Sequence, residues 1–439
     1  MSTSHTTAQS SNTFSESMLN RKSDIVLRVG KICLASGTGS YRVKQSMAKV
    51  AHMLGVVNQA HVTLTEIDST CRQGNQFKTE VCTLYSVGVN NHRIQQIETL
   101  IIDLEANPTQ WFKPNFLDEL DHQLSRIEQQ PGLYRPLMSG LFSAIACSSF
   151  TFLVGGGFME MLGVFFAAGL GHLVRRLLMD KHLNHFFATM VAAAVAAALY
   201  FLIFSVIKHV YGINSQHEAG YIASMLFLIP GFPLITGVLD LAKLDFSSGI
   251  QRIGYAVAII FCATFSAWLV AVCVNMEPQP LLTPHLNDGL LFVFRLLASF
   301  FGVLGFSLMF NSPMRTATTA AAIGMIANTL RLSSIDWWHV PPQAASLLAA
   351  CLVGLLACVF SQIRHCPRIA LSVPAVCIMV PGVYMFRAVY YLEQNNILNA
   401  INWSIQALLI VVALPMGLAL ARMFTDKEWA YTSGPSKNS

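Results

Sequence analysis

Long apolar runs fill the last two thirds of the chain, and each of them predicts a helix that crosses a membrane. Several of the ten runs reach the roughly 20 residues that a helix needs to span about 30 Å of hydrocarbon. The shorter runs fit if their helices are less tilted or are broken. The runs are 137–154, 158–174, 186–207, 219–237, 250–274, 290–310, 316–330, 344–362, 369–386 and 402–424.

Before residue 137 the pattern changes to short amphipathic segments, which predict a small water-soluble α+β region. Apolar residues recur at helical spacing on both sides of "SGTGS" at 36–40, so two helices joined by a glycine turn are expected. Segments 61–67 and 79–89 are rich in β-branched residues and flank a polar turn, which predicts a hairpin. Two further amphipathic helices are expected around 94–104 and 116–127.

Composition supports this division. The chain is 54% hydrophobic and 12% charged, too apolar for an ordinary soluble protein. Residues 21–136 carry 24 charged side chains, whereas the much longer segment 137–425 carries 22. We therefore predict the following parts: a disordered Ser/Thr-rich tail at 1–20, a cytoplasmic α+β domain at 21–136, five-span units at 137–275 and 286–425, and a cytoplasmic tail at 426–439.

The basic residues predict the orientation, because Lys and Arg collect in cytoplasmic loops. If the soluble domain is cytoplasmic, ten basic residues fall in connections that face the cytoplasm and three in connections that face outward. We therefore expect a protein of the cell inner membrane with both termini in the cytoplasm. The inward set is Arg175, Arg176, Lys181, Lys243, Arg252, Arg315, Arg364, Arg368, Arg422 and Lys427. The outward set is Lys208, Arg331 and Arg387.

A repeat divides the membrane part. "IPG" at 229–231 recurs as "VPG" at 380–382, 151 residues later, and an Ala-rich run at 186–202 resembles one at 343–361. Each unit has five spans, an odd number, so the second copy enters the membrane from the opposite side and the two form an inverted repeat. Such transporters bind substrate near the midplane, between the copies, where helices are broken.

The paired Pro-Gly sites are therefore the first functional candidates. Proline removes a helical hydrogen bond, and lipid cannot satisfy the freed backbone groups. A plain proline kink is the alternative for either site alone. Polar residues in or near the spans complete the set. Predicted substrate-binding residues are Pro230, Gly231, Pro381, Gly382, Arg252, Arg315, Arg387 and Asn184, and predicted proton-coupling residues are Asp240 and Glu160.

The sequence gives little support for nucleotide binding, enzymatic catalysis, metal binding or nucleic-acid binding. "ASGTGSYRV" has Arg42 where a nucleotide loop needs its third glycine, and Ser36 lacks a nucleophile elbow. The ten cysteines form no CxxC pair and are interpreted as buried small apolar residues. No basic run interleaved with aromatic residues suggests nucleic-acid binding. We expect no catalytic residue, metal or cofactor.

Five segments together resemble the threonine/serine exporter family: "LASGTGSYRV", "GGGFMEMLGVFFAAGLGHLVRRLL", "HLNHFFATMVAA", "IPGFPLITGVLDLAKLDFSSGIQR" and "VPAVCIMVPGVYMFRAVY". The resemblance runs from about residue 24 to 425 and is closest in the first half. It implies a cytoplasmic domain followed by ten spans, in a fused form of proteins that elsewhere have a separate small subunit. It also implies export of threonine and serine in one branch and of succinate-like dicarboxylates in the split branch.

The leading hypothesis is a proton-driven secondary exporter of small metabolites, with threonine or serine as the favoured substrate. The alternative substrate is a dicarboxylate, which a pocket with two facing arginines would favour. Protons, the lipid bilayer and a second copy of the chain are the other expected partners. Two further alternatives are a passive channel and a membrane-bound enzyme with chemistry around Ser36, Glu66 or Asp68.

Overall fold

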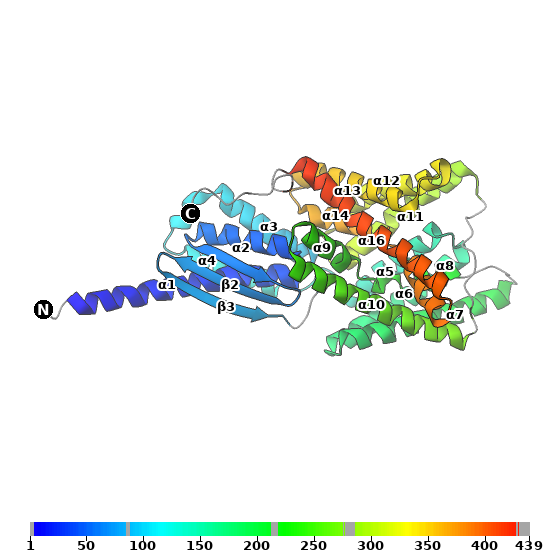
Figure 1. Ribbon diagram of the computed structural model, residues 1–439, viewed down its shortest axis with the longest axis horizontal. Helices are drawn as coiled ribbons and strands as arrows, with labels where there is room; N and C mark the ends of the chain where they lie inside the picture. Colours follow the sequence, from blue (N-terminus) through cyan, green and yellow to red (C-terminus); the bar gives the residue numbers. More distant parts are fainter. Residues whose placement is uncertain are drawn as a thin grey trace.

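The computed structural model describes residues 4–84, 88–211, 218–274, 276, 286–426 and 429. The described chain forms two parts that lie end to end along the long axis of the molecule (Figure 1). An N-terminal α+β region occupies one end, and a bundle of long helices occupies the other. The protein is thus a mostly helical, multi-pass membrane protein with a small N-terminal α+β region.

The N-terminal region packs helices against a three-stranded antiparallel sheet of order β1-β2-β3. Its elements are α1 (Ser4–Ala35), α2 (Ser40–Met53), β1 (Val57–Val62), β2 (Glu66–Gln73), β3 (Gln76–Thr83), α3 (Asn91–Ala106), the 3-10 helix η1 (Pro108–Phe112) and α4 (Phe116–Gln129). The four predicted helices are confirmed, because their periodic apolar residues form one buried core.

Two expectations for this region differ from the structure. The hairpin is β2–β3, but the predicted strand 61–67 is wrong because β1 ends at Val62 and a turn precedes β2. The Thr63 hydroxyl closes that turn by accepting the amide of Glu66 at 3.0 Å. Helix α1 begins at Ser4, inside the segment expected to be a disordered tail. Its apolar face extends back to Leu19, which is buried in the core of the region.

The membrane part contains the helices from α5 onward. These are α5 (Pro136–Leu153), α6 (Phe158–Asp180), α7 (His185–Tyr211), α8 (Glu218–Ala223), the 3-10 helix η2 (Leu226–Leu228), α9 (Gly231–Ala242), α10 (Phe246–Cys273), α11 (Asp288–Met309), α12 (Met314–Trp338), α13 (Pro342–Arg364), α14 (Arg368–Cys377), α15 (Gly382–Glu393) and α16 (Ile397–Thr425).

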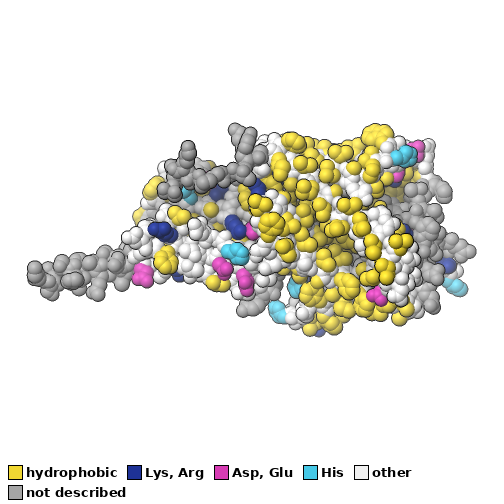
Figure 2. Space-filling view, in the orientation of Figure 1, with side chains coloured by type: hydrophobic (Ala, Val, Ile, Leu, Met, Phe, Trp, Pro, Cys, Tyr) yellow, Lys and Arg dark blue, Asp and Glu magenta, His cyan; other side chains and the backbone are white. Residues whose placement is uncertain are grey.

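Among the described residues, seven helices are long and apolar enough to cross a membrane, or up to nine if each of two bent pairs is one span. The seventh predicted span, 316–330, is not among them, because it lies in α12, which is long but carries too many polar residues to join that set. Figure 2 shows apolar side chains covering the visible face of the bundle, whereas charged side chains gather over the N-terminal region. An apolar outer surface of this size is what lipid contact requires.

Both predicted breaks exist, and they share one geometry. The helix axis bends by 64° before α9 and by 49° before α15. Pro230 and Pro381 have nearly the same backbone angles, φ −81° and ψ 62° against φ −80° and ψ 59°. The amide after each proline bonds the carbonyl before it, at 2.8 Å for Gly231 and 2.9 Å for Gly382. Each break is therefore an inverse γ-turn centred on proline.

The two breaks also touch each other reciprocally. A Cβ atom on Gly231 would lie 2.8 Å from Cys377 Sγ, and one on Gly382 would lie 2.8 Å from Ile229 Cδ1 and 2.9 Å from Leu226 Cδ1. Leu226 and Cys377 are separated by the same 151 residues as the two glycines. Reciprocal contact between equivalent positions is the signature of a local two-fold relation.

The likeness continues beyond the breaks. Helices α9 and α15 have 12 residues each, and both are followed by a left-handed residue, Leu244 at φ 63° and Asn395 at φ 57°. Further back, α5 packs on α6 as α11 packs on α12. The two units thus repeat locally, whereas their inversion across the membrane stays a prediction.

The reciprocal contact predicts that alanine at Gly231 destabilises the fold. The added methyl group would overpack the second break, at a cost of about 1–3 kcal/mol, and Cys377→Ala in the same chain should recover much of that loss. Thermal unfolding in detergent measures both effects. Gly254→Ala is the matched control, because nothing lies within 4 Å of a Cβ there. Equal melting temperatures for G231A and G254A would contradict the close approach of the two breaks.

Candidate functional site

A cavity of about 300 Å³ lies beside the first break, where the bundle meets the N-terminal region. Its walls come from the turn at 230–233, from the last turns of α6 and from α10. Gly37, in a turn after α1, and Gly88, shortly before α3, also line the cavity. We call this space the break cavity. Its volume is at the lower end for small-molecule sites, so it suits a compact metabolite.

One wall of the break cavity is cationic. His172, Arg175 and Arg176 share a face of α6, because residues three and four apart on a helix are neighbours. His172 Nε2 lies 2.9 Å from Ser139 Oγ. No Asp or Glu lines this cavity among the described residues, and neither arginine has a carboxylate within ion-pair distance in that part of the chain.

Two polar atoms on this wall are buried without a partner. Arg175 Nε and His172 Nδ1 make no hydrogen bond within the described structure. Leaving buried polar groups unpaired costs about 1–3 kcal/mol each, and more for a charged group. A ligand with acceptor atoms would remove that cost. The wall is therefore built for an anionic or strongly hydrogen-bonding group.

The first turn of α9 adds to the positive electrostatic potential in the cavity. The helix starts at Gly231 and no side chain caps it, so the positive end of its dipole lies at the cavity. Elsewhere in the lining, His185 Nδ1 lies 3.0 Å from the Tyr255 hydroxyl. Helix terminus, arginines and hydroxyl together can hold a carboxylate, as helix N-termini commonly do.

Arg252 reaches the cavity, but its guanidinium is already engaged. It is 1% exposed, forms an ion pair with Asp240 at 3.2 Å, and donates to the carbonyl of Thr38 at 2.9 Å. Thr38 belongs to the "SGTGS" turn of the N-terminal region. The arginine thus ties the two parts of the molecule together at the edge of the cavity.

Asp240 belongs to the same connection. Its carboxylate accepts the backbone amides of Ser40 at 3.1 Å and Tyr41 at 3.5 Å, and so caps the N-terminus of α2 from another part of the chain. Lys44 of α2 also pairs with Asp245, at 2.7 Å. The turn and α2 are therefore one element that docks the N-terminal region on the bundle. We call this the docking turn.

A second buried charge cluster lies near the start of α8. Arg387 forms a two-point ion pair with Glu218, at 2.8 and 2.9 Å, and both residues are buried. The guanidinium carbon of Arg387 also lies 4.9 Å from the ring centre of Trp403. Glu218 comes from the first unit and Arg387 from the second. The pair therefore joins the two units.

Glu160 lies beside this cluster. It is 5% exposed, and its carboxylate accepts the amides of Gly157 at 2.7 Å and Gly220 at 3.3 Å. No described cation pairs with it. It stands fifteen residues before Arg175 on α6, so at about 1.5 Å per residue the two lie roughly 22 Å apart along the helix.

The other predicted residues lie elsewhere. Arg315 is exposed at the start of α12, and Asn184 caps α7 by accepting the amide of Phe186 at 2.8 Å. Pro381 and Gly382 are buried at the second break and do not line the break cavity. Of the predicted substrate residues, the cavity brings together Pro230, Gly231 and Arg252.

Sequence reasoning missed four important residues. Arg175 and Arg176 counted only as loop charges that set orientation, and His172 and Glu218 were not considered. The signal for the first three was the spacing in "GHLVRRLL", which places one histidine and two arginines on one helical face. Glu218 carried no local signal. Among the described residues, no group of three or more His, Cys, Asp or Glu side chains could hold a metal ion.

Comparison with known proteins identifies the family to which this chain is similar. Residues 24–274 match ThrE, a family of threonine/serine exporters, and residues 295–424 match a second profile described as "Threonine/Serine exporter, ThrE". No solved structure matches the chain.

Curated relatives are distant. The threonine/serine exporter of Corynebacterium glutamicum is 21% identical, over 92% of this chain and 81% of its own length. The probable threonine/serine exporter of Mycobacterium tuberculosis is 20% identical, over 92% and 76%. The probable succinate transporter subunit YjjP of Escherichia coli is 24% identical, over 57% of this chain and 91% of its own length.

The first family match covers more than half of the chain, and the second follows it on the same polypeptide. These are transport proteins, so the membrane-enzyme alternative around Ser36, Glu66 or Asp68 is excluded. The chain therefore belongs to the threonine/serine exporter family, in the fused form that carries both family regions.

Proposed function

We propose that this protein is a secondary active exporter whose substrate, a small carboxylate metabolite, binds in the break cavity. The observation that carries the proposal is a pair of buried nitrogen atoms with no hydrogen-bond partner among the described residues, Arg175 Nε and His172 Nδ1, beside the uncapped start of α9. A carboxylate would accept from Arg175 Nε, and also from His172 Nδ1 when the ring proton is on that atom, and would be stabilised by the helix dipole.

The substrate class follows from the charges. A zwitterion such as threonine or serine needs an acceptor for its ammonium group, and no described carboxylate lines the break cavity. A dicarboxylate needs cations for two groups, and Arg175 and Arg176 provide them. The geometry therefore supports a succinate-like dicarboxylate first. Threonine and serine remain the second candidate, because relatives that match 92% of the chain carry that name.

The two units would alternate access around this cavity. We place the N-terminal region and both termini in the cytoplasm, in the inner membrane, as the distribution of basic residues favours. The break cavity then faces inward. The Glu218–Arg387 pair would hold the outward side closed, because it links the two units at the far end of α6. The reciprocal contact of the breaks supports an inverted pair with its axis between them.

Proton coupling fits Glu160 better than Asp240. Two buried carboxylates, Glu160 and Glu218, lie near α8; Arg387 pairs with Glu218, and no described cation forms an ion pair with Glu160. Intramembrane carboxylates without a cation are typical proton carriers. Asp240 instead has Arg252 and two backbone amides to hold its charge. We propose that Glu160 exchanges the coupled proton and that Asp240 mainly docks the N-terminal region.

Transport assays test the substrate site. In proteoliposomes, the wild-type protein should exchange labelled succinate, and Arg175→Gln should weaken its apparent affinity by about 10- to 100-fold, the loss expected for a charge-assisted hydrogen bond of 1.5–3 kcal/mol. Arg364→Gln, at the exposed end of α13, is the matched control. Counterflow of threonine but not succinate would reverse the substrate order, and full activity of R175Q would exclude the site.

A separate assay tests coupling. Glu160→Gln should abolish succinate-driven proton movement and the pH dependence of net efflux, while succinate exchange continues, because exchange needs no net proton transfer. Glu393→Gln, at the end of α15, is the matched control. Loss of coupling in Asp240→Asn with normal coupling in E160Q would assign the proton to Asp240 instead. Downhill succinate flux without proton movement in the wild type would indicate a passive channel.

A further inference from the structure

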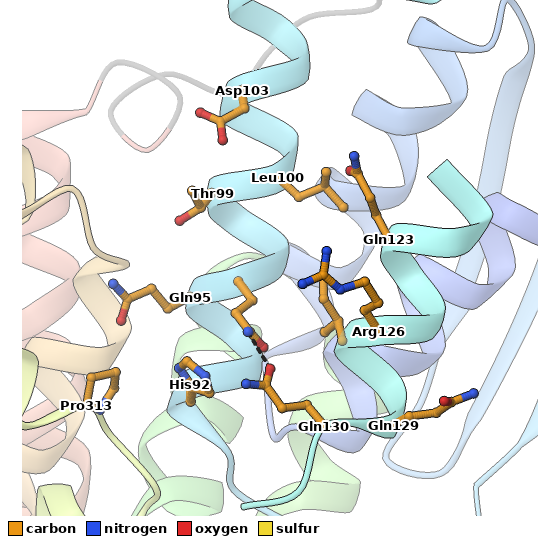
Figure 3. Close-up of a pocket in the computed structure, with 12 residues that line it drawn as sticks. His92, Gln95, Thr99, Leu100, Asp103, Gln123, Arg126, Gln129, Gln130 and Pro313 are labelled. Carbon is orange, nitrogen blue, oxygen red and sulfur yellow. Dashed lines mark hydrogen bonds between the residues drawn. The ribbon is translucent and has the colours of Figure 1, made fainter. Parts of the chain in front are cut away.

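Helix α12 has the same place in the second unit that α6 has in the first, because each is the second long helix of its unit and packs on the first. The two helices run in opposite directions relative to the N-terminal region. Helix α6 ends there, at the break cavity. Helix α12 starts there, since Thr316 Oγ1 donates to Gln95 Oε1 at 3.3 Å, and Gln95 extends from α3 on the side that faces Pro313 (Figure 3). Opposite directions are what the predicted inversion requires.

The two helices carry related side chains at a constant offset. They begin 156 residues apart, and at the same offset His172 corresponds to Asn328 and Arg175 to Arg331. In each helix a polar side chain thus precedes an arginine by about one turn. Arg331 lies fifteen residues after Thr316, so at about 1.5 Å per residue it is roughly 22 Å along the helix from the contact with the N-terminal region. The second arginine is therefore at the opposite end of the bundle from the first.

Neutral side chains hold Arg331 in place. Its Nε donates to Asn328 Oδ1 at 3.2 Å, and its Nη1 donates to Ser346 Oγ of α13 at 3.4 Å. Asn328 Nδ2 donates in turn to Ser299 Oγ of α11 at 2.9 Å, and all three supporting residues are buried. The first helix of the unit supplies this serine, as α5 supplies a serine to His172. The arrangement fixes the guanidinium group without neutralising its charge.

Other arginines of the bundle show that the missing carboxylate is notable. The buried residues Arg252, Arg295 and Arg387 each form an ion pair with Asp or Glu. The partly buried Arg331 forms none with the described residues, and its Nη2 makes no hydrogen bond with them. Cationic side chains inside a membrane bundle usually pair with an anion or mark the pathway of a ligand. Arg331 can therefore donate to a carboxylate that comes from outside the chain.

Arg331 also lies beside the second break. Tyr384, in the first turn of α15, is within electrostatic reach of Arg331. Tyr384 stands 151 residues after Pro233, which lines the break cavity in the first turn of α9. No side chain caps the start of α15, as at α9. Each unit thus places an arginine without a carboxylate partner near the uncapped half-helix that follows its break.

One tryptophan connects this region with the Glu218–Arg387 pair, which we call the outward ion pair. The rings of Tyr384 and Trp403 pack edge to face, with centres 5.3 Å apart. The guanidinium carbon of Arg387 lies 4.9 Å from the centre of the same Trp403 ring. Separation of the outward ion pair would therefore move the residues that lie next to Arg331.

We propose that Arg331, supported by Asn328, is the outward counterpart of Arg175 and binds a carboxylate of the substrate once the outward ion pair has opened. This inference rests on the proposed transport function, and it adds the residue that holds the anion before release. Arg331 Nη2 donates to the carboxylate, and the start of α15 stabilises its charge. The substrate thus passes between two arginines at equivalent positions in the two units.

Exchange of labelled succinate in proteoliposomes of one orientation tests the site, with the concentration varied on one side at a time. Arg331→Gln should raise the half-saturating concentration on the outward side at least tenfold and change the inward value less than twofold. Arg175→Gln should show the opposite pattern. Asn328→Asp should act like R331Q, because the new carboxylate pairs with the guanidinium group while the region stays folded. Lys208→Gln, at an exposed cation near the end of α7, is the matched control.

Three results would overturn the proposal. One is an unchanged outward affinity in N328D and R331Q while R175Q loses inward affinity, which would leave the proposed function intact. Another is an equal loss on both sides in N328D, because Arg331 would then support the fold or the movement rather than bind substrate. The third is a wild-type protein that exchanges no succinate, which would overturn the proposed dicarboxylate site as well. If R331Q does not fold, N328D alone decides between these outcomes.

Discussion

Backbone N–H and C=O groups within the hydrocarbon need partners inside the protein, and the two proline breaks are where this constraint acts most strongly. Pro230 and Pro381 interrupt their helices, so the freed groups must lie against protein or a ligand. The structure meets part of this need by closing each break into a γ-turn and packing the two breaks against each other. The start of α9 remains beside a cavity.

Charged side chains lie on both sides of the contact between the two proline breaks. At one end of α6, two arginines with no carboxylate partner in the described part of the chain line the break cavity, and at the other end Glu160 lies buried with no described cation beside it. The α6 helix thus links the proposed substrate site with the residue proposed to exchange the proton. The docking turn lies at the edge of the same cavity. Arg252 and Asp240 use their charges to hold this turn, and with it the N-terminal region, beside the cavity.

The parts that sequence could predict were those with local causes. Proline geometry is local, so the breaks at Pro230 and Pro381 were predictable, as were the amphipathic helices of the N-terminal region. Partners distant in the chain were not. Arg387 was predicted to bind substrate, yet its charge pairs with Glu218, which is 169 residues away. The first strand was missed because its boundary depends on a turn at Thr63 rather than on apolar periodicity.

A structure of the full chain with bound succinate, determined by electron cryomicroscopy, tests the central claim most directly. The account predicts ligand density in the break cavity, between the Arg175 guanidinium and the turn at Pro230 and Gly231. Density at the Glu218–Arg387 pair, with the break cavity empty, would contradict it.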